Sequence, residues 1–236
     1  MSVSCTNWDK ESWLSSKKYF EDLTDILIRI LKLNAKSTIL DAGCGRAHLL
    51  DHISTKIEFD QFLTGVEPVF HKQKNNKKVK INNSNIQNFL SKNKKKYDFI
   101  IFKQVMHLIP LIERKELYKL IKSSLSYQGK LVIIQMDKKQ NFPTFPIMSQ
   151  RLDESINKHE EIIKELNLNF YNIKKAKFLF KVEIKKDDYL KMIENKFISI
   201  LSDLSNYEIE QGCSYIKHHY PSDIIFNDVL NIYIFS

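Results

Sequence analysis

The chain has few of the residues that interrupt or cross-link a fold. Its 236 residues include five glycines, five prolines and three cysteines. Cys5, Cys44 and Cys213 are an odd number at wide spacing, which builds neither a disulfide framework nor a metal site. No linker rich in proline or serine and no internal repeat divides the chain. We therefore expect one α/β domain in the reducing cytoplasm, with no bound metal.

Long apolar runs are also missing. No stretch is long enough to cross a membrane, and residues 1–12 lack the apolar core of a signal peptide. Arginine is scarce too, although the net charge is +9, because nearly all the cations are lysines. Lysine, asparagine and isoleucine are frequent everywhere, which is typical of genome composition rather than of a nucleic-acid-binding patch. The lysine runs at 74–80 and 92–96 are interpreted as solvated surface, the alternative being a weak attraction for acidic substrates.

What the chain does contain is one glycine turn between an apolar run and an amphipathic run. Residues 38–50 read Thr-Ile-Leu-Asp-Ala-Gly-Cys-Gly-Arg-Ala-His-Leu-Leu. This order predicts a strand, a turn at Gly43 and Gly45, and a helix whose N-terminal amides face a nucleotide-like ligand. Asp41 falls where the strand ends, and a carboxylate there suits a ligand that carries positive charge.

Residues 39–45 resemble motif I of the class I S-adenosylmethionine-dependent methyltransferases. The resemblance implies that the two glycines lie against the methionine part of the cofactor and that Asp41 contacts its ammonium group, directly or through water. Ala47 stands where the family usually has a third glycine. His48 stands where a dinucleotide-binding dehydrogenase would need a glycine.

A second acidic residue follows the next predicted strand, residues 62–68. Glu67, followed by Pro68, comes about twenty residues after Gly45, the distance at which a doubly wound fold places a carboxylate on ribose hydroxyls. Taken alone, a glutamate after a strand would face solvent. The spacing from motif I favours a cofactor contact for Glu67 and Pro68.

Further along, the resemblance implies an adenine contact at Asn85 and Ile86. The family commonly has an aspartate there that accepts from the adenine amino group, followed by an apolar residue that packs on the ring. An ordinary helix cap at Asn85 is the alternative.

The fourth predicted strand, residues 97–102, ends at the position of the family's motif IV. Lys103, Gln104 and His107 are its polar candidates. Lys103 is interpreted as an anchor for a carboxylate of the cofactor or the substrate, with Gln104 beside it on the cofactor. His107 could take a proton from the acceptor as a general base, or could simply fill space.

Two aromatic segments are candidates for substrate binding. Trp8 and Trp13 belong to an N-terminal segment that either closes over the active site or staples the arm to the surface. Phe145, in a proline-stiffened segment over residues 141–148, is interpreted as part of the pocket wall, with loop packing as the alternative.

The resemblance implies a Rossmann-like seven-stranded sheet, with strand 7 antiparallel, flanked by helices and carrying a helical cap inserted before the last strand. We expect a lid or helix over residues 1–33, a cofactor-binding core over 34–137, and cap helices with C-terminal strands over 138–236.

The expected function is methyl transfer from S-adenosylmethionine to oxygen, nitrogen or sulfur of a small molecule, including a carboxylate-bearing metabolite. The expected partner is that small molecule, with no nucleic acid or membrane, and the expected state is a monomer or homodimer. An RNA or protein methyltransferase and a non-catalytic cofactor-binding protein are the alternatives.

Overall fold

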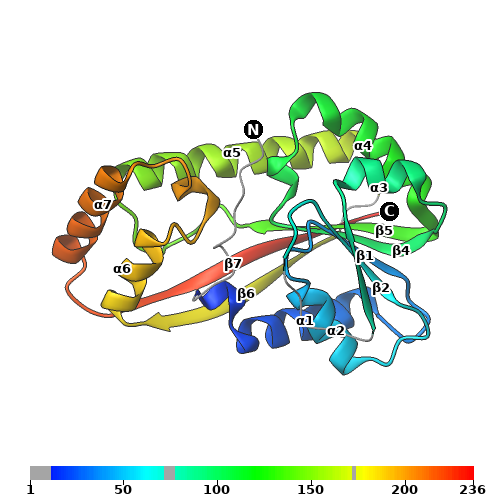
Figure 1. The fold of residues 1–236 in the computed structure, drawn as a ribbon, viewed down its shortest axis with the longest axis horizontal. Helices are drawn as coiled ribbons and strands as arrows, with labels where there is room; N and C mark the ends of the chain where they lie inside the picture. The colour runs from blue at the N-terminus through cyan, green and yellow to red at the C-terminus, as the bar shows by residue number, and fades with distance from the viewer. Residues whose placement is uncertain (1–11, 72–77, 172–173) are drawn as a thin grey trace.

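A seven-stranded sheet organises the protein (Figure 1). The computed structural model describes residues 12–71, 78–171 and 174–236, so Trp8 lies outside the described residues. The strand order is β3-β2-β1-β4-β5-β7-β6, and β7 runs antiparallel to both of its neighbours while β1 to β5 are parallel. The strands are β1 (Ile39–Ala42), β2 (Leu63–Glu67), β3 (Val79–Asn83), β4 (Tyr97–Lys103), β5 (Leu125–Met136), β6 (Lys174–Ile184) and β7 (Ile224–Phe235). The predicted fold is confirmed.

Helices cover both faces of this sheet (Figure 1). One face packs against α1 (Lys17–Leu31) and α2 (His48–Lys56), and the other against α3 (Ile86–Lys92), α4 (Leu111–Ser124) and α5 (Pro146–Asn169). Because successive side chains of a strand point to opposite faces, Ile39 joins the core under α1 while Leu40 joins the core under α4. This alternation decides which polar residues at the strand ends share a face.

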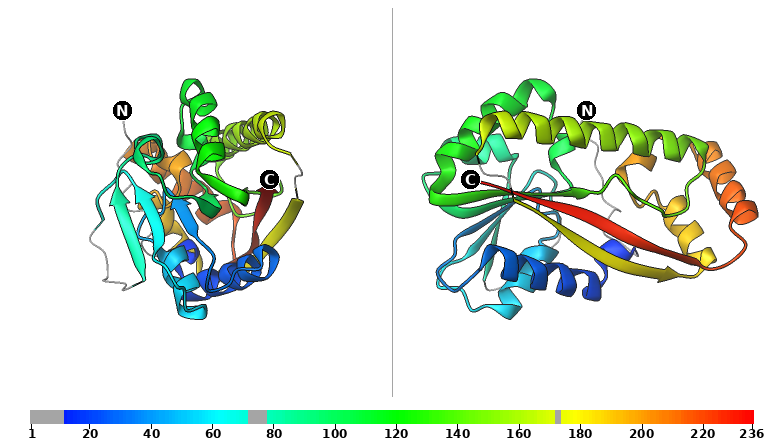
Figure 2. Two further views of the ribbon diagram at one scale, coloured as in Figure 1. Left: turned by 90° about the vertical axis from the view of Figure 1, so that its right-hand side faces the viewer. Right: turned by 180° about the vertical axis from the view of Figure 1, so that it is seen from behind.

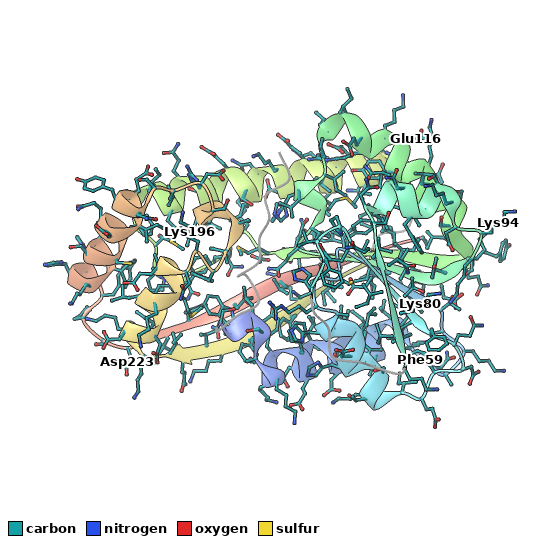
Figure 3. The ribbon with its side chains drawn as sticks, viewed as in Figure 1. Phe59, Lys80, Lys94, Glu116, Lys196 and Asp223 are labelled. Atoms are coloured by element: carbon teal, nitrogen blue, oxygen red, sulfur yellow. The ribbon has the colours of Figure 1, made fainter. Side chains whose placement is uncertain are left out.

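The cap is inserted between β6 and β7. It consists of α6 (Lys186–Glu194), the short 3-10 helix η3 (Ser199–Leu201) and α7 (Asn206–His219). Figure 2 shows that the β6–β7 ribbon extends beyond the other strands and that the cap lies at its far end. The spacing of Ser205 and Glu208 predicts a capping box, and this box opens α7. Lys196, labelled in Figure 3, lies in the cap. It holds the loop before α7 by donating to the carbonyls of Ser202 and Leu204.

The helix α5 connects the cap with the core. Near its start, Arg151 donates to the Ile200 carbonyl in the cap at 3.2 Å. Near its end, Glu165 pairs with Arg114 of α4 at 3.0 Å and accepts from the Tyr118 hydroxyl. One helix of 24 residues therefore contacts both parts of the molecule.

The pair Gln128-Gly129 predicts a tight turn before the fifth strand. In the structure β5 already begins at Leu125, and residues 126–129 lie in an irregular register between Tyr97 and Phe99 of β4. The apolar residues Leu190, Ile193 and Phe197 predict one helix from near Asp187, and its predicted end was wrong: α6 ends at Glu194, because Lys196 takes a left-handed conformation with φ of 51°. No helix within the described ranges has the length and apolar character that a membrane crossing requires.

Replacing Gly212 with alanine tests how tightly the cap is packed. A Cβ there would lie 2.6 Å from the ring of Phe145, which is 3% exposed. Gly→Ala within a helix normally stabilises by about 1 kcal/mol, whereas overpacking costs about 1–3 kcal/mol. We expect Gly212→Ala to lower the free energy of urea unfolding and Ser214→Ala, on the exposed side of α7, to leave it nearly unchanged. A variant as stable as wild type would contradict the packing.

Candidate functional site

The glycine turn is built on two left-handed residues. Gly43 and Gly45 have φ of 72° and 53°, and the Gly43 amide donates to the Val66 carbonyl of β2 at 2.8 Å. A Cβ on Gly43 would lie 2.6 Å from the Val105 side chain. The backbone of Gly43 can approach Val105 this closely only because glycine has no Cβ. Ala47, at the position of the third glycine, also has a positive φ of 61° and immediately precedes α2. That conformation costs a non-glycine residue about 1 kcal/mol.

Asp41 is the residue before the last of β1, and its carboxyl group is buried. It is 2% exposed, and its Oδ1 has no hydrogen-bond partner among the described residues. Burial raises the pKa of Asp41 to about 7; the charge of Lys103 lowers it and that of Glu67 raises it further. A buried acceptor without a partner is costly, so this oxygen is suited to a donor that a ligand brings.

Glu67 lies at the end of β2, on the same face as Asp41. Its two oxygens accept from the backbone amides of Gly45 at 2.9 Å and Val69 at 3.0 Å. The carboxylate therefore faces the glycine turn and is only 9% exposed, not solvent-facing. Each oxygen keeps a second lone pair for a further donor. Pro68, by contrast, is exposed.

Lys103 at the end of β4 points to the same face as the two acids. Its Nζ donates to Gln104 Oε1 at 3.1 Å and lies 5.6 Å from the centre of the Phe20 ring of α1. Gln104 is itself left-handed, with φ of 56°. The charge of Lys103 lowers the pKa of Asp41 and also that of Asp228, which shows that the ammonium group lies near two carboxyl groups.

Asp228, in the middle of β7, is a site residue that the sequence analysis missed. It is 3% exposed and accepts from the indole nitrogen of Trp13 at 2.9 Å. Burial raises its pKa, which Trp13 and Lys103 counteract. The fully buried Tyr19 of α1 lies beside it, and the pKa of that phenol is raised by burial and by the charge of Asp228. The only signal in the sequence was a polar residue within an apolar strand.

The predicted adenine contacts lie at the start of α3. Asn85 is exposed and its side chain caps the helix by accepting from the Asn88 amide at 2.8 Å, as the alternative interpretation describes. Ile86 is 8% exposed and belongs to the core under α4. Their contact with an adenine stays a prediction.

His107, the predicted base, packs against a second histidine. Its ring centre lies 4.7 Å from that of His159 on α5, and its Nε2 is buried without a partner among the described residues. Burial and the neighbouring charges lower the pKa of His107 to about 3, and burial lowers that of His159 to about 4. An imidazole with so low a pKa is a weak base at neutral pH. The geometry favours the space-filling interpretation.

The predicted substrate residues divide in the same way. Trp13, in the 3-10 helix η1 (Trp13–Ser15), is held among aromatic rings on the face that carries Asp41 and Lys103. Phe145 packs against Gly212 of the cap, which agrees with loop packing. The structure thus brings together Asp41, the glycines, Glu67, Lys103, Gln104 and Trp13, and leaves Asn85, Phe145 and His107 in packing or capping positions. Among the described residues no group of three His, Cys, Asp or Glu side chains could hold a metal ion.

These residues fit the cofactor that the sequence resemblance implies. The unpartnered oxygen of Asp41 is suited to an ammonium donor, and the glycine turn allows a ligand to approach the backbone closely.

Comparisons with known proteins agree with this geometry. A family model described as a methyltransferase domain matches residues 16–168. No curated protein sequence matches the chain.

Solved structures share the fold at low sequence identity. A protein of Anabaena variabilis, assigned as a methyltransferase of an antibiotic biosynthesis pathway, superposes with a TM-score of 0.63 and 15% identity over 89% of this chain and 95% of its own. An S-adenosylmethionine-dependent methyltransferase of Geobacter sulfurreducens in complex with S-adenosylhomocysteine gives 0.54 and 11%, over 98% and 96%. The plantazolicin methyltransferase BpumL, with a pentazolic substrate analogue and S-adenosylhomocysteine, gives 0.52 and 15%, over 98% and 88%.

The raised pKa of Asp41 predicts a stability that depends on pH. The folded protein holds this proton up to about pH 7, whereas the unfolded chain releases it near the ordinary value of 3.8. The stability that protonated Asp41 contributes is therefore fully present below pH 4. The free energy of unfolding then falls as the pH rises from 4 to 7. We expect ligand-free Asp41→Asn to become more stable than wild type between pH 5 and 8, in urea unfolding. A difference that stays constant across this range would contradict the assignment.

The two buried histidines predict the opposite dependence. The unfolded chain protonates histidine near pH 6.5, but folded His159 resists down to about 4, so stability is lost as the pH falls through this window. One buried histidine accounts for roughly 2 kcal/mol at pH 5. We expect His159→Phe to flatten the fall in unfolding free energy between pH 7 and 5, and His218→Phe, at an exposed position of α7, to leave it unchanged. An unaltered slope in His159→Phe would be inconsistent with a buried neutral imidazole.

Proposed function

Because the chain belongs to the methyltransferase domain family, whose enzymes use S-adenosylmethionine as cofactor, we propose that it methylates an oxygen, nitrogen or sulfur atom of a small molecule. The single observation that carries the proposal is the buried carboxyl group of Asp41 beside the glycine turn, whose Oδ1 has no hydrogen-bond partner among the described residues. A cationic cofactor brings the donor and the charge that this group lacks.

The residues at the strand ends have separate tasks in cofactor binding. Asp41 would hold the ammonium group, Gly43 and Gly45 would leave room for the methionine chain, and Glu67 would accept from the ribose hydroxyls with the lone pairs that its backbone contacts leave free. Lys103 is placed to balance the carboxylates around it. Asn85 and Ile86 would serve the adenine at the start of α3.

Catalysis then depends mainly on position and on exclusion of water. When bound, S-adenosylmethionine supplies a methyl group on a sulfonium whose leaving group needs no acid. The remaining task of the chain is to hold a nucleophile in line with that methyl group and to keep water out. The rings of Tyr19 and Phe20 on α1, whose centres lie 6.0 and 5.6 Å from the Lys103 ammonium, would perform the second of these tasks at the strand ends.

A small-molecule acceptor is supported by the cap. The segment from α6 to α7 lies at the far end of the β6–β7 ribbon, and there it would limit the size of a substrate. The solved relative BpumL was crystallised with a substrate analogue of its own, and S-adenosylhomocysteine occurs in two of the relatives.

An RNA methyltransferase is the second candidate, favoured by the net charge of +9. RNA binding that falls steeply with added salt would support it. Binding of S-adenosylmethionine without release of S-adenosylhomocysteine over a broad panel of acceptors would instead favour a non-catalytic protein.

The cofactor site is tested by calorimetry with S-adenosylhomocysteine. Removing a charged hydrogen-bond partner costs about 1.5–3 kcal/mol. We therefore expect Asp41→Asn and Glu67→Gln each to weaken binding by about tenfold or more. The matched control is Glu116→Gln, because this glutamate is 64% exposed on α4 (Figure 3). Unchanged affinity in Asp41→Asn would remove the basis of the proposal.

A further inference from the structure

Trp13 occupies a position that is built like a binding pocket. Its indole stands among three aromatic rings, with ring centres 5.0 Å away at Phe226, 5.1 Å at Phe197 and 6.5 Å at Tyr189. These rings come from β7, the loop after α6, and α6 itself. The cap and the sheet therefore meet around this one side chain.

At the inner end of this position lies a carboxyl group that the cofactor contacts proposed above leave unused. Asp228 accepts from the Trp13 indole at 2.9 Å. The buried hydroxyl of Tyr19 lies beside it, and its hydrogen bond to the carboxylate helps to lower the pKa of Asp228. A buried carboxylate surrounded by aromatic faces is suited to a cation, which gains from both the charge and the rings.

Trp13 also lies between an outer groove and the residues proposed to bind the cofactor. A groove of about 730 Å³ lies over β6. Its lining includes Phe180, Val182, Met192 and Trp13, together with charged side chains such as Asp188. In the sheet, β7 lies between β6 and β5, and β4 with Lys103 comes next. Trp13, which rests on β7, therefore stands between the groove and the residues around Asp41 and Lys103.

We propose that the Trp13 indole is a stand-in for the methyl acceptor, and that the acceptor is an arylalkyl amine whose ammonium group replaces the indole N–H on Asp228. The ammonium gives one proton to the Asp228 carboxylate, which frees the nitrogen lone pair for the methyl group. This inference rests on the proposed function and names its substrate class. The acceptor enters from the groove over β6, displaces Trp13 and stacks against Tyr189, Phe197 and Phe226. A carboxylate-bearing acceptor is disfavoured, because Lys103 is already flanked by Asp41 and Asp228.

The test uses two probes of equal shape and opposite charge, phenethylamine and 3-phenylpropionate. The chain has two tryptophans, so a Trp8→Phe background makes Trp13 the single fluorescent reporter. We expect phenethylamine at millimolar concentration to shift the Trp13 emission to longer wavelength as the indole leaves its pocket. We expect it to bind about tenfold or more tightly than 3-phenylpropionate, which corresponds to about 1.4 kcal/mol.

Asp228→Asn keeps an oxygen for the indole but removes the charge, so the preference for the amine should fall to near one. Asp223→Asn is the matched control, since Asp223 is exposed at the turn between α7 and β7 (Figure 3). Trp13→Phe provides a second variant, which loses the indole donor and part of the ring volume and should bind phenethylamine several-fold more tightly, as measured by calorimetry.

Equal binding of both probes, an unmoved Trp13 emission, or an amine preference that survives Asp228→Asn would overturn the inference. Calorimetry with S-adenosylhomocysteine on the same proteins distinguishes failure of the proposed function from failure of the acceptor class. If the wild-type chain does not bind S-adenosylhomocysteine, the proposed function is contradicted. If it binds S-adenosylhomocysteine but shows no preference for the amine, only the acceptor class is contradicted.

Discussion

The structure depends on keeping three carboxyl groups buried on one face of the sheet. Asp41, Glu67 and Asp228 are each less than a tenth exposed, and all lie on the face that α1 covers. Burying a carboxylate is unfavourable unless donors or cations surround it. The chain supplies backbone amides to Glu67, an indole to Asp228 and the ammonium of Lys103 near two of the three. Asp41 is left with the charge of Lys103, and its Oδ1 has no hydrogen-bond partner among the described residues.

Alternation along the strands explains why these groups meet. Asp41 is two residues after Ile39, and Lys103 two after Ile101, so both follow apolar side chains into the core under α1. Residues far apart in sequence are brought together because the carboxyl ends of parallel strands share one edge of the sheet.

Much of this arrangement could be predicted from the sequence. The glycine turn, the acid before it and the acid at Glu67 have fixed local spacing, so strand order and sheet type followed from the family resemblance. The capping box at Ser205 was equally local, because its two hydrogen bonds lie within four residues. These features depend on neighbours in sequence, which a pattern can reveal.

The remainder depends on contacts between distant segments. Asp228 and Trp13 are 215 residues apart, and no periodicity marks a polar residue in β7 as functional. His107 was predicted from its place after β4, but only the packing of α5 reveals that His159 lies against it. The pair Gln128-Gly129 lies within β5 rather than before it. Glycine also permits irregular strand pairing, because Gly129 approaches the Tyr97 carbonyl more closely than a Cβ would allow.

The helix α5 has a mechanical consequence. At 1.5 Å per residue its 24 residues extend about 36 Å without a break, joined to the cap through Arg151 and to α4 through Glu165. Because α5 contacts both the cap and α4, it opposes a hinge motion of the cap relative to the core. We therefore expect access of a substrate to depend on side-chain movements around η1 rather than on a change in the distance between cap and core.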